Sequence, residues 1–345
     1  MPEPTQNQTP DLTRGAAHET LDPSPRVMGS HEVHLPDHFV APIAEEQGRA
    51  GIEQQLEGKP SSLWRDAWSS LRRNPIFLVS ALLMLFVLFV AAFPGVFTSA
   101  SPTAGCELSN SNGGPAPGHP LGFTNQGCDI LARVVHGTGP SVLVGFGATL
   151  GVVIIGGLLG ALAGYFGGWV DAIISRCMDI FFALPLILGA IVLMQVPVMR
   201  ENRGVATLAL TLVIFGWPSI ARITRSSVIA VRNADFVTAA RSLGMGRFGI
   251  LFKHVLPNAA GPVIVIATIS LGTFIVAEST LSFLGIGLPA EAISWGNDIS
   301  AARPQLRTNP ETLFWPSLML SITVLSFIML GDSLRDALDP KGRTK

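Results

Sequence analysis

The amino-acid sequence predicts an all-helical protein that crosses a lipid bilayer about six times. Of its 345 residues, 48% are hydrophobic and only 14% are charged, whereas soluble domains carry about 25% charged residues. The mean hydropathy is positive, at +0.45. The apolar residues gather in runs long enough to cross the hydrocarbon core of a bilayer, which takes about 20 helical residues. Together these features favour a polytopic membrane protein over a globular one.

The chain before the first apolar run is polar. Residues 1–60 are acidic and rich in Pro, Glu, Gln and Gly, so they bury too little apolar surface to offset their ordering entropy, and we expect a disordered cytoplasmic tail. No basic start precedes an apolar stretch there, so we expect no cleavable signal peptide. Residues 61–75 place Trp64, Trp68 and Leu71 at helical spacing with arginines on other faces, which predicts an amphipathic helix in the membrane interface.

The apolar runs predict where the spans lie. The first span is expected over 76–97, followed by an extracytoplasmic loop over 98–140 and a core over 141–340. The five spans of this core are expected at 141–166, 177–198, 205–228, 259–286 and 313–334. Pro185 predicts a kink or a local opening of the helix in the third span. The fifth span is long and contains Gly and Ser, so we expect it to be broken or tilted.

Basic residues next to the spans predict the orientation of the chain. Lys and Arg cluster before the first span, between the fourth and fifth spans, and after the sixth, and they are scarcer in the other loops. Because basic loops remain in the cytoplasm, both termini and the loop over 229–254 are expected to be cytoplasmic.

A stripe of glycines runs along the second predicted span. The glycines recur at intervals of four or five residues, at Gly147, Gly151, Gly156, Gly160 and Gly164. Small residues at this spacing let helix backbones approach closely in lipid. The stripe therefore predicts tight helix packing, either within this chain or against a partner.

The cytoplasmic loop has the pattern of a compact helical knob. Residues 235–243 predict a short helix with an apolar face made of Phe236, Ala239, Ala240 and Leu243. Gly244 and Gly246 stop this helix, and a second helical stretch over 248–255 is expected to end at Pro257. A small, alanine-faced knob is suited to insertion into a groove of another protein.

This loop resembles the "EAA" loop of bacterial ABC importer permeases, which reads E-A-A, three free positions, G, nine free positions, I-x-L-P. Thr238, Ala239 and Ala240 stand for E-A-A, Gly244 for the glycine, and residues 254–257 for I-x-L-P. Two positions depart from the pattern: Thr238 replaces the Glu, a role that Asp235 could take, and His254 replaces the Ile. A His before V-L-P-N resembles the peptide and nickel branch of the family.

Further stretches resemble the same branch in family order. They are LGFTNQGCDILARVVHG, GGWVDAIISRCMDIFFALP, AESTLSFLGIGLP, ISWGNDIS and LGDSLRDALDPK. From 63 to 341 the chain is similar to the second, "C"-type permease subunit of dipeptide or oligopeptide importers, with nickel as the rival substrate. The resemblance implies a type I importer permease with a coupling helix, in the bacterial cytoplasmic membrane.

The resemblance also implies partners and site residues. A homologous permease would complete the translocation path, two ATPase subunits would bind ATP and Mg, and an extracytoplasmic solute-binding protein would deliver the peptide. The residues that would couple this chain to the ATPases are Asp235, Thr238, Ala239, Ala240, Arg241, Gly244, His254, Leu256 and Pro257. No G-x-x-x-x-G-K-[ST] loop occurs in the sequence, so we expect no ATPase activity, cofactor or nucleic-acid partner for this chain alone.

Charged residues inside spans are candidates for function. Glu278, with Ser279 and Ser282, is a candidate for the translocation path, and a buried hydrogen-bonded helix contact is an equal alternative. For Asp179 we expect an ion pair with Arg176 or Arg222 near the interface.

The three cysteines form no C-x-x-C pair and no metal-ligand cluster with histidine, so no metal site is expected. Cys106 and Cys128 both fall in the first extracytoplasmic loop, where an oxidising compartment favours a disulfide. Cys177 falls at the cytoplasmic end of the third span and is expected to be reduced.

Two other classes of membrane protein remain as alternatives. A secondary transporter would show inverted repeats and ion ligands at broken helices, and the sequence contains one deep carboxylate but no evident repeat. An intramembrane protease of the rhomboid type needs Ser and His within helices, and no His lies in a predicted span.

Overall fold

The computed structural model describes residues 68–338. The predicted tail over 1–60 and the first part of the predicted interfacial helix, 61–67, lie outside these residues. Within 68–338, five helices are long and apolar enough to span a membrane, and a bent pair of shorter helices makes a sixth span. The expected all-helical fold of about six spans is confirmed.

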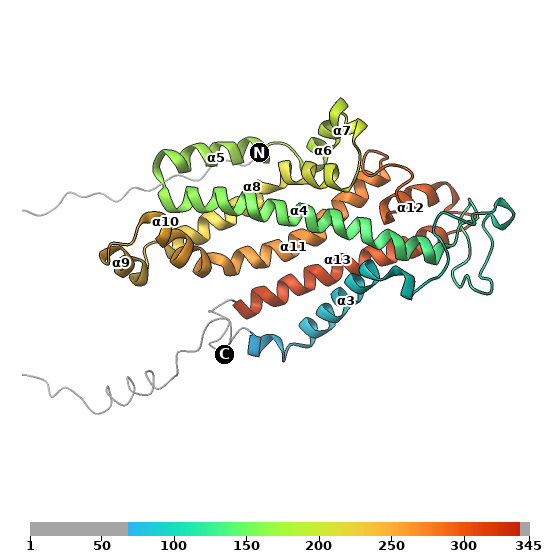
Figure 1. Cartoon of the computed structure of the whole chain (residues 1–345), viewed down its shortest axis with the longest axis horizontal. Helices are drawn as coiled ribbons and strands as arrows, with labels where there is room; N and C mark the ends of the chain where they lie inside the picture. The colour runs from blue at the N-terminus through green and yellow to red at the C-terminus, as the bar shows by residue number, and fades with distance from the viewer. Residues whose placement is uncertain (1–67, 339–345) are drawn as a thin grey trace, which may run out of the picture. The chain divides into compact units, whose positions relative to one another are not determined.

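The spanning helices lie roughly side by side (Figure 1). They are α3 (Pro75–Ala92), α4 (Ile130–Phe166), the pair α5 (Gly168–Phe182) and α6 (Leu186–Met194), α8 (Val205–Val231), α11 (Leu256–Phe283) and α13 (Glu311–Leu338). Shorter helices are α7 (Pro197–Glu201), α9 (Asp235–Ser242), α10 (Arg247–Ile250) and α12 (Trp295–Ala302), with single turns η1 (Pro94–Val96), η2 (Leu108–Asn110), η3 (Leu251–Val255) and η4 (Arg303–Gln305). One end of the bundle carries α9 and α10, and the other carries α12.

The centre of the bundle is the contact between α4 and α8. The glycines of α4 face α8 in the order Gly147 to Ala209, Gly151 to Val213, Gly156 to Trp217, Gly160 to Ala221 and Gly164 to Arg225. Because both sets of numbers rise together, the two helices run parallel. A Cβ atom on Gly156 would lie 2.5 Å from the carbonyl oxygen of Trp217. The glycine stripe therefore serves packing within this chain, by bringing two backbones together.

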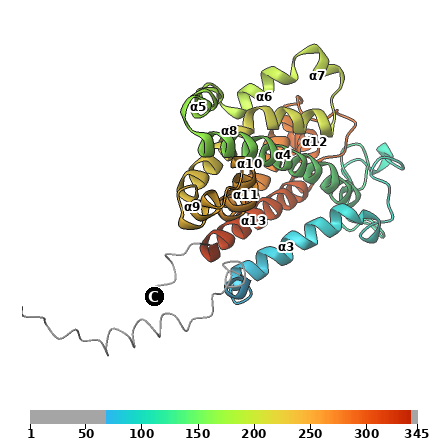
Figure 2. The ribbon, with the colours of Figure 1, turned by 60° about the vertical axis from the view of Figure 1, so that its left-hand side comes forward.

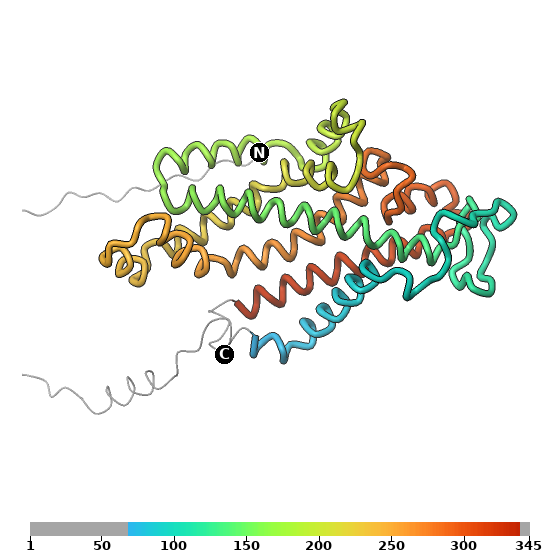
Figure 3. The backbone as a smooth tube through the Cα atoms, viewed as in Figure 1, coloured from blue at the N-terminus to red at the C-terminus, as the bar shows by residue number. Residues whose placement is uncertain are grey.

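The third span is opened at Pro185, which is one of the two expectations for this residue, and it begins at Gly168 rather than at residue 177. Helices α5 and α6 meet at an angle of 82°, and the chain bends sharply between them (Figure 3). The break lies at Pro185, which directly precedes α6. Proline disfavours the helical conformation of the residue before it, so the helix opens completely there.

The first span and the first loop are both shorter than expected. Helix α3 ends at Ala92 rather than at residue 97, because Pro94 starts the separate turn η1. The loop predicted over 98–140 ends at residue 129, since the carboxylate of Asp129 accepts a hydrogen bond from the Ala132 N–H at 2.5 Å and starts α4. Helix α4 then continues through Pro140. Figure 2 shows α3 alongside α13 at one side of the bundle.

The fifth span is continuous, so the expectations of a break and of a helix end at Pro257 are both wrong. Helical structure runs without interruption from Arg247 to Phe283. The π-helical turn η3 ends at Val255, two residues before Pro257, whose ring nitrogen has no hydrogen to donate. The side-chain amide of Asn258 donates to the carbonyl oxygen of His254 at 2.6 Å. The helix therefore passes the proline with a wider turn just before it and a side-chain hydrogen bond beside it.

The seam between α4 and α8 can be tested with two neighbouring glycines. We expect Gly156→Ala to lower the melting temperature of the detergent-solubilised protein by several degrees, because overpacking costs about 1–3 kcal/mol. Gly157→Ala is the matched control, since a Cβ there meets no atom within 4 Å. Equal melting temperatures for the two variants would contradict the proposed seam.

Candidate functional site

The helix α9 stands at one end of the bundle as a compact knob. Asp235 lies in its first turn and Arg241 in its last, where each charge complements the helix dipole. Gly244 ends the helix with a φ of +79°. The Gly244 N–H donates to Arg241 at 3.0 Å and the Met245 N–H donates to Ala240 at 3.2 Å, which is the Schellman pattern of a helix stop. The predicted glycine stop at 244 is therefore present.

The knob has one face on the bundle and another that faces outward. Val237 and Ala240 are buried and pack in a cluster with residues of α4, α8, η3 and α11. Phe236 is 44% exposed and Leu243 is 87% exposed. The apolar face predicted from sequence is thus divided, because Ala240 turns toward the bundle while Phe236, Ala239 and Leu243 remain outside.

The remaining residues predicted to couple the chain fall into two groups. Asp235, Thr238, Arg241 and Gly244 are exposed on or beside α9. His254, Leu256 and Pro257 lie on the helical run that returns to the bundle. Among the described residues, Nε2 of His254 is buried without a hydrogen-bond partner. Of this second group, Leu256 packs against the cluster that holds α9 to the bundle, and Pro257 is exposed.

Glu278 lies inside the bundle of this chain. Its side chain is fully buried, and its carboxylate accepts hydrogen bonds from Ser282 at 2.9 Å and from Ser279 at 3.1 Å. Ser279 and Ser282 are themselves buried. From the sequence, Glu278, Ser279 and Ser282 were candidates either for the translocation path or for a buried hydrogen-bonded contact. In this chain they form the buried contact, and all three side chains are buried.

At the opposite end of the bundle, α12 folds back between the spans. Trp295 is fully buried, and its indole N–H donates to the carbonyl oxygen of Val134 at 3.0 Å. The Ser300 hydroxyl donates to the carbonyl oxygen of Phe283 at 2.8 Å. These contacts tie α12 to α4 and to the end of α11. From the sequence, α12 was recognised only through the family likeness of ISWGNDIS.

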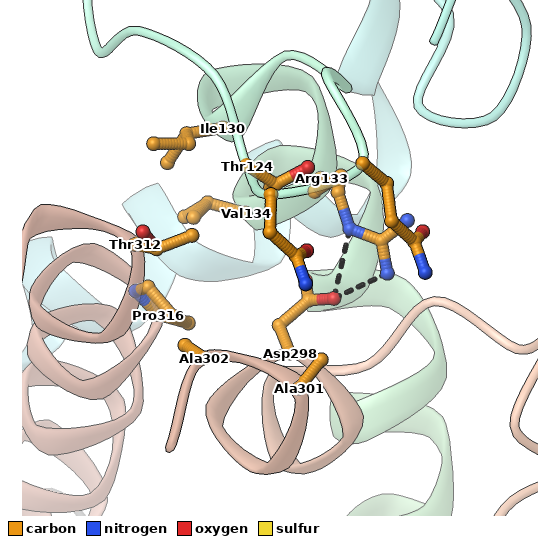
Figure 4. A pocket seen from close by; sticks show the side chains of 11 residues that line it. Thr124, Ile130, Arg133, Val134, Asp298, Ala301, Ala302, Thr312 and Pro316 are labelled. Carbon is orange, nitrogen blue, oxygen red and sulfur yellow. Dashed lines mark hydrogen bonds and ion pairs between the residues drawn. The ribbon is translucent and has the colours of Figure 1, made fainter. Parts of the chain in front are cut away.

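An ion pair that the sequence analysis missed holds α12 to α4. Arg133 donates through Nε to Oδ1 of Asp298 at 2.9 Å, and its NH2 group contacts the same oxygen. Figure 4 shows this pair beside a cavity of about 30 Å³ that Thr124 and Thr312 help to line. That volume holds about two water molecules. Burial raises the pKa of Asp298, and the guanidinium of Arg133 opposes the rise.

The loop before α4 forms a cap over this end. Cys106 and Cys128, the pair expected from the sequence, form a disulfide. His119 contacts the carboxylate of Asp129 at 2.5 Å. The side-chain amide of Asn309 reaches the carbonyl oxygen of Phe123 at 3.4 Å, which joins the loop to the start of α13. Within 68–338, no group of three or more His, Cys, Asp or Glu residues is placed to hold a metal ion.

Comparison with protein families gives two matches. Residues 156–344 match the family model described as the binding-protein-dependent transport system inner membrane component. Residues 62–112 match the N-terminal transmembrane domain of oligopeptide transport permease C.

Individual relatives cover most of the chain. The dipeptide transport system permease protein DppC of Alkalihalophilus pseudofirmus is 39% identical over 81% of this chain and 90% of its own length. The oligopeptide transport system permease protein OppC of Bacillus subtilis is 35% identical over 90% of this chain and 99% of its own. The glutathione transport system permease protein GsiD of Pectobacterium atrosepticum is 34% identical, over 81% and 91% respectively.

The fold also resembles a solved transporter structure. A chain of the MetNI methionine ABC transporter, in inward facing conformations, superposes with a TM-score of 0.51 at 20% sequence identity. The match covers 60% of this chain and 96% of that chain. This likeness concerns the fold, and it agrees with the type I permease architecture expected from the sequence.

Counting thiols tests the disulfide in the cap. The sequence has three cysteines, and Cys177 is free, so a mass-tagging maleimide should add one tag to the denatured, unreduced protein and three after reduction. Cys177→Ser is the control, and it should take up no tag before reduction and two tags after it. Three tags without reductant would show that the cap is not cross-linked.

The ion pair at α12 can be tested by removing one charge. Asp298→Ala leaves the guanidinium of Arg133, which is 16% exposed, without its counter-charge, and we expect a loss of about 3 kcal/mol of stability. Arg133→Gln combined with Asp298→Asn should recover part of that loss. A melting temperature for Asp298→Ala equal to that of Glu291→Ala, an exposed carboxylate on the same segment, would contradict the buried pair.

Proposed function

This chain belongs to the family of binding-protein-dependent transport system inner membrane components, and we propose that it is a permease subunit of an ATP-driven importer for dipeptides or oligopeptides. The observation that carries the proposal is α9, a capped knob at one end of the bundle with an outward apolar surface. A surface of this kind, made of Phe236 and Leu243, is costly to leave in water and is suited to a partner groove.

We assign the end of the bundle that carries α9 to the cytoplasm. The basic residues near this end support the assignment, since Arg232, Arg241, Arg247 and Lys253 all lie within or beside the knob. With this orientation both termini are cytoplasmic, and the disulfide-linked cap and α12 are on the outside. The membrane would be the bacterial cytoplasmic membrane.

The partners follow from the family. A homologous permease would complete the translocation path, and two ATPase subunits would dock on α9 and supply the sites for ATP and Mg. An extracytoplasmic solute-binding protein would deliver substrate to the end that carries α12. In this arrangement the chain moves substrate but does no chemistry of its own.

Movement of α9 would reach the spans through packed side chains. Val237 and Ala240 join α9 to a buried cluster that includes Ala161 of α4, Val228 of α8 and Ala259 of α11. Closure of the ATPases would therefore shift three spans together rather than one. Such a rigid connection is what biases a transporter between two conformations.

Peptides are favoured over nickel as the substrate. The relatives described above are named for dipeptides, oligopeptides and glutathione, and glutathione is itself a small peptide. An ion-coupled secondary transporter is less well supported, because the deep carboxylate of Glu278 is already bonded to serines of its own helix. A pathway ion would have to displace those bonds.

The proposal is tested by purifying the tagged chain in mild detergent and assaying what accompanies it. We expect a second permease and P-loop ATPases to co-purify, and peptide-loaded binding protein to stimulate ATP hydrolysis. Uptake of peptide into liposomes should then require ATP. A chain that purifies alone and moves solute under an ion gradient without ATP would overturn the proposal.

The outward face of α9 provides a specific variant. Phe236→Ala combined with Leu243→Ser should reduce ATPase co-purification at least about tenfold, because truncating apolar anchors at an interface commonly costs more than 1 kcal/mol each. Leu306→Ser is the matched control, since Leu306 is 54% exposed but lies after α12 at the opposite end. If both variants retain the ATPases, docking does not use α9.

A further inference from the structure

Two Arg–Asp contacts join α5 to α8, and they differ in geometry. Asp171 receives two hydrogen bonds from Arg225, at 2.5 Å and 2.6 Å. This two-point pairing is the strong form of the interaction, and both side chains are at most one-third exposed. The pair between Asp171 and Arg225 is thus a structural clamp between the helices.

The second contact is loose and open. Asp179 lies 3.8 Å from Arg176 and 3.7 Å from Arg222, the two partners expected for it from the sequence. The three side chains are 57%, 86% and 55% exposed, in that order. The guanidinium of Arg222 lies over the ring of Phe182, 3.9 Å from its centre. We call Arg176, Asp179 and Arg222 the charged triad, and it carries one net positive charge.

The triad lies deeper than the clamp. Helix α5 begins at Gly168, directly after the end of α4, and Asp179 lies about two turns, or roughly 12 Å, further along it than Asp171. Arg222 likewise precedes Arg225 on α8 and lies some 13 Å inside the end of that helix. Exposed apolar side chains lie at this level of α5 and just beyond its end, including Ile180 at 66% and Leu184 at 51%.

Exposed charges at this depth are not suited to contact with lipid tails. Charged side chains inside spans face a water-filled cavity or a bundle interior, because hydrocarbon solvates them poorly. Here the triad faces out of this chain, so water at this level would lie between this chain and a neighbour. If the proposed function holds, that space is the translocation path between the two permeases.

The chemistry of the triad selects a ligand class. We propose that Arg176 and Arg222 contact the free carboxylate of a peptide as it passes. The negative charge of Asp179 partly neutralises the two guanidiniums, so the carboxylate is bound only weakly. Guanidinium groups bind carboxylates through paired N–H donors. Contacts of 3.7–3.8 Å to Asp179 leave both arginines available. A path needs binding weak enough for release, and a partly neutralised pair of arginines provides it.

Cys177 is the free cysteine next to Arg176 in the chain, and it reports on the charge near the triad from a neighbouring face of α5. It is exposed and free, directly follows Arg176, and is the one cysteine of the sequence outside the disulfide. In membranes that contain the assembled transporter, its rate of modification by an anionic and by a cationic methanethiosulfonate can be compared. We expect both water-soluble reagents to react, the anionic one faster.

Removing a triad arginine should change the preference between reagents. Arg222→Gln should lower the ratio of anionic to cationic rates severalfold, because the loss of one positive charge slows the anionic reagent and speeds the cationic one. Arg73→Gln is the control, because Arg73 is an exposed arginine next to α3. Dialanine should slow the modification of Cys177, and dialanine amide, which lacks the carboxylate, should not.

Three outcomes would overturn the inference. Reaction with a membrane-permeant maleimide alone would show that the triad faces lipid, where its arginines bind headgroup phosphates. A rate ratio unchanged by Arg222→Gln would show that the triad sets no local potential. Equal protection by dialanine and its amide would exclude carboxylate recognition. Stimulation of ATP hydrolysis by peptide-loaded binding protein is measured on the same membranes as a control. This stimulation would be lost if the proposed function is wrong, and it would remain if only the role of the triad is wrong.

Discussion

The parallel contact between α4 and α8 is the constraint on which the rest of the structure depends. Glycines on α4 remove side chains where the backbone of α8 must pass, and a Cβ on Gly164 would lie 2.7 Å from the carbonyl oxygen of Arg225. In a bilayer, where lipid tails are as apolar as the side chains, close backbone packing of this kind is a main source of helix association. Two parallel helices in turn require a connection that returns across the membrane, which α5, α6 and α7 provide.

This rigid pair positions both ends of the molecule. Toward the end that carries α9, Ala161 and Val228 belong to the cluster on which Val237 rests. Toward the other end, α4 extends beyond its apolar stretch, and there Arg133 and the carbonyl oxygen of Val134 hold α12. One long helix thus joins the cluster under the proposed coupling knob to the segment that would meet the extracytoplasmic partner, and under the proposed function a change at either end would pass along this helix.

The charged residues divide according to the environment they face. Glu278 and Asp298 are buried and hydrogen-bonded to neighbours in this chain, as is usual for polar groups away from water, and Oδ2 of Asp298 has no partner among the described residues. Asp171 and Arg225 clamp two helices together. Asp179, Arg176 and Arg222 are exposed and only loosely paired, and these are the groups open to contacts outside the chain. Burial in the fold, rather than position within a span, separates structural charges from candidates for function.

The sequence by itself determined the class of fold, the positions of α8 and α13 to within a few residues, and the glycine stop after α9, because long apolar runs and glycines at positive φ are local requirements. It could not place Glu278 in the interior, pair Arg133 with Asp298, or divide the two faces of α9, since each depends on residues far apart in the chain. It also missed the start of α4, which is set by the cap at Asp129. It missed the passage of the fifth span through Pro257 as well, where a π-helical turn lets the helix continue although proline usually ends one. Which side of each helix meets the bundle and which meets a partner was decided by the tertiary structure alone, because helical periodicity fixes the faces of a helix but not its neighbours.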